Sequence, residues 1–395
     1  MSTVLKNLPH TTKELIALLK IQGGSSSDVE LRAAAFQMAD MEFCYAALNK
    51  VSRSFAVVIQ QLPAALRNPV CIFYLTLRGL DTIEDDMNLP LPQKLHLLQN
   101  FYKQCGNESL QLENIGDTPD CRLLLLHYYK VARAFNKLEP KYREVITDIC
   151  RKMGDGMAQF ATSKLHTQDD YNLYCHYVAG LVGYGLSGLF SASGKEDTQL
   201  KNQLGISNAM GLMLQKTNII RDYFEDLLQQ RIFWYSEVWQ KYTDDFSWFS
   251  KNPQHPKSLA CLNELVVDAL THVQDCFTYL RLLQNKEVFR FCAIPQAMAL
   301  ATLAEVYNNA AVFTSTVKIR KPQAASIMVY TNDMSDFQKF AEQALSLIES
   351  KTTSNTPLGA QVLSQVAAIK TTLYKPQPYQ WETPATITIE QTVFF

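Results

Sequence analysis

The residues best suited to chemistry form an acidic cluster at residues 74–86, where an apolar run ends in YLTLRGLDTIEDD. Residues three and four apart share one face of a helix. The residues on that face are Tyr74, Arg78, Asp81, Glu84 and Asp85. Three carboxylates on one face repel each other unless a cation binds them, and an all-oxygen ligand set suits Mg²⁺, which substrate phosphates usually complete. A solvated helix end is the alternative for an isolated D-x-x-x-D pattern.

A second polar stripe lies at residues 215–226, in the sequence QKTNIIRDYFED. At helical spacing, one face carries Gln215, Asn218, Asp222 and Asp226. Two helices that each bear D-x-x-x-D beside an arginine could face each other across a cavity. A diphosphate held there by Mg²⁺ would be polarised as a leaving group, and its departure would leave a carbocation.

The composition favours a large buried core and argues against several functions. Apolar residues make up 47% of the 395 residues, enough for one or two domains, and the net charge of -1 argues against a nucleic-acid binder. The nine cysteines show no C-x-x-C spacing, so reduced thiols in a cytosolic protein are favoured over disulfides or zinc. No stretch of eighteen apolar residues occurs, so no transmembrane anchor is predicted.

The elements that must position the two acidic motifs are predicted to be helices. Proline and glycine positions place their boundaries. Pro63 and Pro69 should bracket a short connection into the first acidic helix, and an apolar helix should bend or begin at Pro295. Other expected elements are a short helix and linker in 1–30, a helix from Asp28 to about Ser52, a polar loop over 105–120, helices over about 121–162 with Pro140 beginning one, and helices over about 258–285 and 335–350.

Two further segments could contribute to a site. Ser52-Arg-Ser54 opens an apolar helix, and helix N-termini readily bind anions. Residues 170–188 combine a tyrosine stripe that includes Tyr174 with glycines at 180, 183, 185 and 188. Because each glycine costs about 1 kcal/mol inside a helix, this pattern indicates close backbone approach or a kink beside a ligand. The alternative is a core aromatic stripe in which glycines relieve crowding.

The later segments offer apolar walls and a basic cluster. Aromatic residues around Phe289 and Phe291 could line a cavity in which ring faces stabilise positive charge and water is excluded, although such residues also suit an ordinary core. Lys318-Ile-Arg320-Lys321 could hold phosphates and is otherwise surface.

Over residues 40–330 the chain resembles the squalene synthases of the squalene/phytoene synthase family. Six ordered motifs carry the resemblance: Ser52-Arg-Ser-Phe-Ala56, Leu80-Asp-Thr-Ile-Glu-Asp-Asp-Met87, Tyr174-Cys-His-Tyr-Val-Ala-Gly180, Leu214 to Asp226, Phe291-Cys-Ala-Ile-Pro-Gln296 and Val317-Lys-Ile-Arg-Lys321. The resemblance implies an all-α isoprenoid-synthase helical bundle with a central cavity. It also implies a transferase that condenses two farnesyl diphosphates head to head to presqualene diphosphate and reduces this with NADPH to squalene.

The resemblance also implies roles for individual residues. The residues that would bind Mg²⁺ and the diphosphates are Asp81, Glu84, Asp85, Asp222 and Asp226. Tyr174 would be catalytic, moving a proton during cyclopropane formation, while Phe55 and Phe291 would flank the cations. NADPH and diphosphate contacts would come from Arg53, Arg78, Arg221, Lys318 and Arg320, and substrate contacts from Ser54, Tyr74, Gln215 and Asn218.

Some positions depart from the family pattern. The usual C-terminal membrane anchor is absent, Gly188 stands where a basic residue is expected, and Pro322 replaces the glycine usual after K-I-R-K. Tyr184 stands where a smaller aliphatic is usual, and Phe224 replaces a leucine. These differences leave open a derived terpene synthase with an NADPH-independent product. A non-catalytic prenyl-diphosphate-binding protein is the alternative from another class.

The expected organisation is an N-terminal extension over 1–30, one helical domain over 31–350 and a polar, poorly ordered tail over 351–395. We expect a monomer with farnesyl diphosphate as its small-molecule substrate and no nucleic-acid partner. The expected location is the cytoplasm, or a peripheral position at the endoplasmic reticulum membrane.

Overall fold

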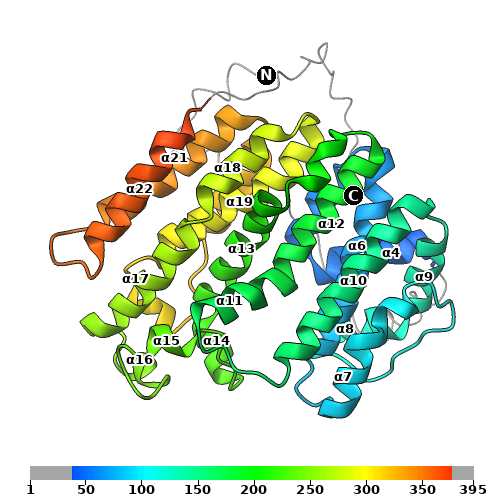
Figure 1. Ribbon diagram of the computed structural model, residues 1–395, viewed down its shortest axis with the longest axis horizontal. Coiled ribbons are helices and arrows are strands. Elements are labelled where there is room, and N and C mark those ends of the chain that lie inside the picture. The colour runs from blue at the N-terminus through cyan, green and yellow to red at the C-terminus, as the bar shows by residue number, and fades with distance from the viewer. Residues whose placement is uncertain (1–37, 376–395) are drawn as a thin grey trace.

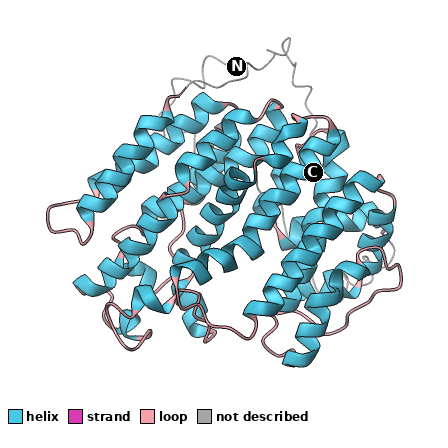
Figure 2. Ribbon diagram, viewed as in Figure 1, coloured by secondary structure: helices cyan, strands magenta, loops and turns pink. Residues whose placement is uncertain are grey.

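The computed structural model describes residues 38–375, and throughout that range the chain forms helices and no strands (Figures 1 and 2). This confirms the predicted all-α class. The expectations for residues 1–30 and for a helix beginning at Asp28 lie outside the described residues. Within residues 38–375, no helix is both long and apolar enough to cross a bilayer.

A central helix, α13 (Leu204–Arg221), organises the packing. It contacts α12 (Leu181–Ser193), α17 (Pro256–Leu270), α18 (Val273–Leu282) and α19 (Lys286–Val306), and Figure 1 shows it in the middle of the bundle. The other helices around the site are α5 (Arg53–Gln60), α6 (Ala64–Asp85), α10 (Pro140–Phe160), α11 (Gln168–Cys175), the π-helical segment η2 (His176–Gly180) and α14 (Tyr223–Leu228).

The remaining elements cover the outside of this arrangement. They are α4 (Asp40–Val51), α7 (Leu91–Asn100), η1 (Phe101–Gln104), α8 (Pro119–Leu126), α9 (Tyr128–Asn136), η3 (Thr198–Asn202), α15 (Ser236–Trp239), α16 (Trp248–Lys251), η4 (Ala310–Phe313), α20 (Lys321–Tyr330), α21 (Met334–Ser350) and α22 (Gly359–Leu373). The expected polar loop over 105–120 separates η1 from α8, and Pro140 begins α10 as predicted.

The first acidic helix ends at a fixed position because its last turn is capped from outside. The carboxylate of Asp86 accepts hydrogen bonds from the backbone N–H groups of Asn88, at 2.9 Å, and Gly116, at 2.8 Å. Lys94 Nζ donates to the carbonyl oxygen of Glu84 at 2.6 Å, which satisfies one of the carbonyls left free at a helix C-terminus. The acidic motif is therefore held at a rigid helix end.

Glycines bring the tyrosine-bearing segment against α13. A Cβ atom added at Gly211 would lie 2.2 Å from the carbonyl oxygen of Ala179, and one at Gly183 would lie 2.1 Å from that of Ser207. Both distances are far below van der Waals contact, so only glycine allows the backbones to approach this closely. The π-helical turn of η2 also lies here, and an extra residue in a helical turn is frequent at functional sites. The close backbone approach predicted for these glycines therefore occurs, and the same segment contains a π-helical turn.

Several predicted boundaries are wrong because packing overrides local signals. Pro69 lies inside α6 rather than at a boundary. Of the two alternatives for Pro295, a bend or a helix start, the start is wrong, because Pro295 lies inside α19. Pro69 is buried, so its ring adds apolar contact that offsets the missing backbone donor. The single helix predicted over 258–285 is divided into α17 and α18.

The expectation of a poorly ordered polar tail from residue 351 is wrong for residues 359–373, which form α22. Val362, Val366, Ile369 and Leu373 recur at helical spacing and are fully buried against a bundle face. Figure 1 shows α22 beside α21 at one edge of the molecule, and α22 also contacts α17 and α18. Because the segment contains many Thr, Ser and Gln residues, its overall composition does not reveal this narrow apolar stripe.

We predict that Gly211→Ala destabilises the fold by about 1–3 kcal/mol, because the added methyl group meets a backbone carbonyl that cannot move independently. Urea unfolding measures this change. Gly205→Ala is the matched control, since Gly205 lies on the same helix and an added Cβ atom would meet nothing within 4 Å. Equal stability of the two variants would contradict the close approach of α13 and η2.

Candidate active site

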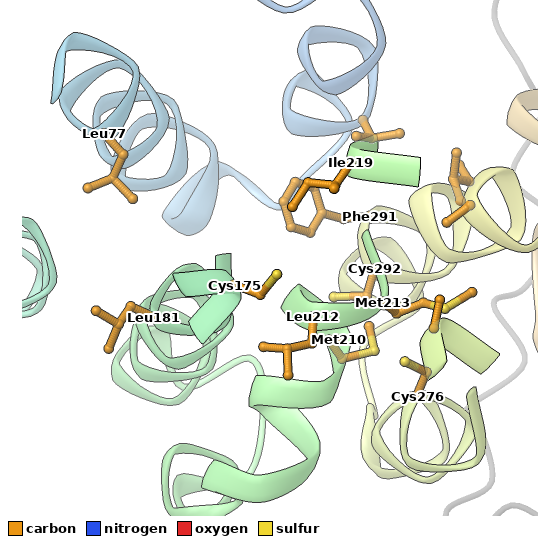
Figure 3. Packing of buried hydrophobic residues seen from close by; sticks show 14 of the residues in the cluster. Leu77, Cys175, Leu181, Met210, Leu212, Met213, Ile219, Cys276, Phe291 and Cys292 are labelled. Carbon is orange, nitrogen blue, oxygen red and sulfur yellow. The ribbon is translucent and has the colours of Figure 1, made fainter. Parts of the chain in front are cut away.

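A cavity of about 220 Å³ lies between α5, α6, α10, α12, α13 and α19. Most of its wall is apolar. Figure 3 shows Phe291 and Cys292 of α19 beside Met210 and Met213 of α13, close to this region. The polar lining residues are Tyr74, Arg78, Asp81, Gln215, Asn218 and Gln296. The structure therefore brings polar residues of both acidic stripes to a single apolar cavity.

Two aromatic residues that the resemblance implied, Phe55 and Phe291, line the cavity. Phe55 lies with its ring centroid 6.0 Å from that of Tyr74, and Phe291 packs edge-on against Phe190 at 5.9 Å. Phe291 is only 4% exposed. Aromatic rings that are held in place by such packing can present their electron-rich faces to a cation.

The first acidic motif is electrostatically strained. Burial, with additional repulsion from Asp85, raises the pKa of Asp81 to about 7, although Arg78 opposes this change. Burial and repulsion from Asp85 and Asp81 raise the pKa of Glu84 to about 8. Burial also raises the pKa of Asp85. A group of carboxylates that disfavour their own negative charge is suited to binding cations.

The second motif bends where the sequence predicted a continuous helical stripe. Helix α13 ends at Arg221, and Asp222 adopts non-helical backbone angles before α14 begins. The guanidinium of Arg221 holds the Asp222 carboxylate in a two-armed contact, with N···O distances of 2.7 and 2.6 Å. Burial raises the pKa of Asp226 to about 7, with further repulsion from Asp222 and Asp85. The last cause shows that Asp226 and the first motif lie close enough to interact.

Arg231 joins the two motifs, and the sequence analysis did not identify it. Its Nη1 lies 2.9 Å from Asp85 Oδ1, and its Nη2 lies 3.2 Å from Asp226 Oδ1. The only signal in the sequence was a cation five residues after Asp226. That signal could not show which carboxylate 146 residues away it would meet.

The donor set fits Mg²⁺ better than a metal that needs a complete protein cage. Among residues 38–375, no three His, Cys, Asp or Glu side chains are grouped so that they could hold a metal ion by themselves. Mg²⁺ commonly takes one or two carboxylates and completes its shell with waters and substrate phosphates. Mutually repelling carboxylates on two facing helices match that requirement.

Tyr174 is buried beside the acidic residues but lines a different hollow. Its ring stacks on Phe233 at a centroid distance of 5.6 Å, and both residues line a hollow of about 690 Å³. Burial, together with the negative charges of Glu84 and Asp85, raises the pKa of Tyr174 well above its ordinary value. The phenol therefore keeps its proton strongly while those charges are uncompensated.

The predicted cationic residues are not all in one place. Arg78 lies at the cavity, 3.9 Å from Asp81, and its Nε is buried with no hydrogen-bond partner. Arg221 lines an adjoining hollow of about 170 Å³. Lys318 and Arg320 are exposed and do not line the cavity. The side chains of Arg53 and Ser54 lie outside the described residues.

The unusual residues noted in the sequence lie away from the cavity wall. A Cβ atom at Gly188 would face Val145 of α10 at 3.2 Å. Pro322 lies in the first turn of α20, where proline is favoured because the helix needs no donor from it. Tyr184 packs edge-on against His176 at 5.4 Å. None of these three residues lines the 220 Å³ cavity.

Comparisons with known proteins agree with this geometry. A family model described as squalene/phytoene synthase matches residues 48–323. Squalene synthase BSS of Botryococcus braunii is 46% identical over 342 residues, covering 84% of this chain and 74% of that protein. Squalene synthase 1 of Arabidopsis thaliana is 44% identical over 331 residues, covering 83% and 80%. A solved complex of TcSQS with the ligand E5700 superposes with a TM-score of 0.83 at 42% identity, covering 85% of this chain and 98% of that one.

We predict that Asp81→Asn removes most of the thermal stabilisation that Mg²⁺ and inorganic pyrophosphate together give the wild type, because bound ligands raise the melting temperature only through an intact site. Without ligands the variant should be as stable as the wild type or more stable, since one repelling carboxylate is gone. Differential scanning fluorimetry measures both quantities. Asp155→Asn, on the exposed face of α10, is the control, and an undiminished ligand effect in Asp81→Asn would exclude Asp81 from the site.

Proposed function

Because this chain belongs to the squalene/phytoene synthase family, we propose that it condenses two farnesyl diphosphates head to head to presqualene diphosphate and then converts this with NADPH to squalene. The observation that carries the proposal is that Arg231 joins Asp85 and Asp226 of the two acidic motifs, while Asp81, Gln215 and Asn218 of the same two segments line an apolar cavity with aromatic residues in its wall. Such a cavity suits a farnesyl chain, and the acidic end suits its diphosphate. The enzyme is accordingly a farnesyl-diphosphate farnesyltransferase.

Five carboxylates would hold Mg²⁺ and, through it, the diphosphates: Asp81, Glu84, Asp85, Asp222 and Asp226. The bound ions would supply Lewis-acid polarisation of the diphosphate leaving group. Arg221 orients the Asp222 carboxylate through its two-armed contact, which limits the directions that Asp222 can offer to a ligand. Tyr74, Gln215 and Asn218 line the cavity and would contact the substrate, as would Ser54.

The cavity would protect the carbocation that remains when diphosphate leaves. Phe55 and Phe291 would flank it and stabilise its charge through their ring faces. The aliphatic side chains of the remaining wall exclude water, which would otherwise quench the cation. This part of the protein would therefore contribute to catalysis through the shape of the cavity and the exclusion of water, rather than through proton transfer.

Tyr174 would move a proton during cyclopropane formation: the neutral phenol would give its proton to an oxygen of the departing diphosphate, and the phenolate so formed would take the proton lost from carbon. Its raised pKa means that the resting phenol is neutral and can donate a hydrogen bond to a departing diphosphate oxygen. The phenol can exchange its proton readily only after the neighbouring negative charge has been offset. The stacked Phe233 holds its ring in one orientation.

NADPH would bind through arginine and lysine side chains rather than a dinucleotide-binding fold, since the one G-x-G-x-x-G pattern, at Gly183–Gly188, lies inside helix α12 and no strand precedes it within residues 38–375. Arg78 offers a buried Nε without a hydrogen-bond partner, which an anionic group could use. Arg53, Arg221, Lys318 and Arg320 would supply further contacts. The enzyme would act as a monomer, in the cytoplasm or peripherally at the endoplasmic reticulum membrane.

Product analysis tests the proposed function. Purified protein incubated with farnesyl diphosphate, Mg²⁺ and NADPH should form squalene, and without NADPH it should accumulate presqualene diphosphate, detected as the alcohol after dephosphorylation. A hydrocarbon or alcohol formed equally with and without NADPH would instead identify a terpene synthase of altered chemistry. Binding of farnesyl diphosphate without any product would identify a non-catalytic binding protein.

We predict that Tyr174→Phe lowers the rate of presqualene diphosphate formation by about 10²–10⁴-fold, the usual contribution of a positioned acid or base. Substrate binding should be retained because the ring still stacks on Phe233. Single-turnover assays without NADPH measure the first step alone. Tyr177→Phe is the control, since its ring also packs near Phe160, at 6.1 Å. An unchanged rate in Tyr174→Phe would remove this phenol from the mechanism.

A further inference from the structure

Arg231 occupies the gap between the two acidic motifs. Its two terminal nitrogens contact one carboxylate from each motif, Asp85 at 2.9 Å and Asp226 at 3.2 Å. We propose that Arg231 is a positioning residue that acts as the resident counter-cation of the metal site. It holds the two motifs together before Mg²⁺ binds, and it donates to the diphosphate once Mg²⁺ has taken the carboxylates. The inference rests on the proposed function, because it assumes that this site binds a metal diphosphate.

The backbone places Arg231 over the motif by a specific turn. Gln230 has a φ of 58°, in the left-handed region that non-glycine residues seldom adopt, and this reverses the chain after α14. The backbone N–H of Arg231 then donates to the carbonyl oxygen of Asp226 at 2.9 Å. A strained residue followed by a fixed return contact indicates that the position of Arg231 is tightly determined.

The side chain of Arg231 is held at the site, but its present partners do not use all of its hydrogen-bond donors. Its guanidinium lies over the ring of Phe233, 5.5 Å from the centroid, and that ring stacks on Tyr174. Its Nε is buried and has no hydrogen-bond partner, so one donor remains for a new acceptor. A planar fork of donors is the arrangement that matches a phosphate group.

A purely structural ion pair would look different. Lys216 and Asp268 form such a pair at 2.7 Å, with Lys216 only 1% exposed and Gln168 donating to the other Asp268 oxygen. The Arg231 side chain is 21% exposed, and it meets carboxylates that would serve as ligands rather than carboxylates in the core. Arg231 and a metal ion therefore compete for the same oxygen atoms. An ion pair that only stabilised the fold would instead help to preserve the metal site.

Because Arg231 competes with the metal ion for the carboxylates, replacing Arg231 should increase the affinity of the site for the metal ion rather than decrease it. In substrate-free protein, Arg231→Gln should bind Mn²⁺ more tightly than the wild type, by about threefold or more, because the carboxylates have lost a cationic competitor. With Mn²⁺ present, the same variant should bind inorganic pyrophosphate about tenfold or more weakly, because a charge-assisted donor is lost. Electron paramagnetic resonance of free Mn²⁺ measures the first quantity, and calorimetry measures the second.

The control is Arg151→Gln. Arg151 also contacts two carboxylates, Asp148 at 3.0 Å and Asp155 at 3.5 Å, but on the exposed face of α10, and its loss should change neither affinity. Mn²⁺ affinity that is equal or weaker in Arg231→Gln would overturn the inference and leave the proposed function intact. If neither the wild type nor the variant binds Mn²⁺ and pyrophosphate together, the metal-diphosphate site itself is wrong, and the inference falls with it.

Discussion

Repulsion between carboxylates at the ends of α6 and α13–α14 is the constraint on which the rest of the structure depends. Burial and mutual repulsion raise the pKa values of Asp81, Glu84 and Asp226 into the range of about 7 to 8. Isolated helices would not hold such groups together. The surrounding packing does so, through capped helix ends, glycine contacts that fix α13 against η2, and the Arg231 bridge. The resulting site is destabilised without cations, which favours their binding.

The apolar wall of the cavity would stabilise the cation, whereas the acidic motifs would bind the diphosphate. In the proposed reaction, a cation released from its diphosphate needs stabilisation without a nucleophile, which aromatic rings in an apolar cavity wall can provide. Helix α19 supplies Phe291, α5 supplies Phe55, and α13 contributes both to the cavity wall and, at its end, to the second acidic motif. Because α13 reaches both the cavity wall and the second acidic motif, one rigid element fixes the positions of these two parts relative to each other.

Local sequence patterns predicted the parts of this arrangement that depend on helical spacing. The two acidic faces followed from residues three and four apart, although the second is interrupted at Asp222, whereas the all-α fold and the aromatic residues Phe55 and Phe291 followed from the resemblance to the family. The patterns failed where a distant partner decides the outcome. Helix α22 forms because four apolar residues meet a bundle face, and Pro69 lies inside a helix because packing outweighs one lost hydrogen bond. The Arg231 bridge depends on the turn at Gln230 and on a carboxylate from another helix, neither of which spacing reveals.

The central claim is that both acidic motifs bind one metal-diphosphate assembly. Crystals grown with Mn²⁺ and a farnesyl thiodiphosphate, which resists ionisation, allow anomalous scattering to locate the metal directly. We expect anomalous peaks beside Asp81 and Asp85 and beside Asp222 and Asp226, with the diphosphate between them and the prenyl chain in the 220 Å³ cavity. Metal peaks away from either motif, or a diphosphate bound elsewhere on the molecule, would contradict it.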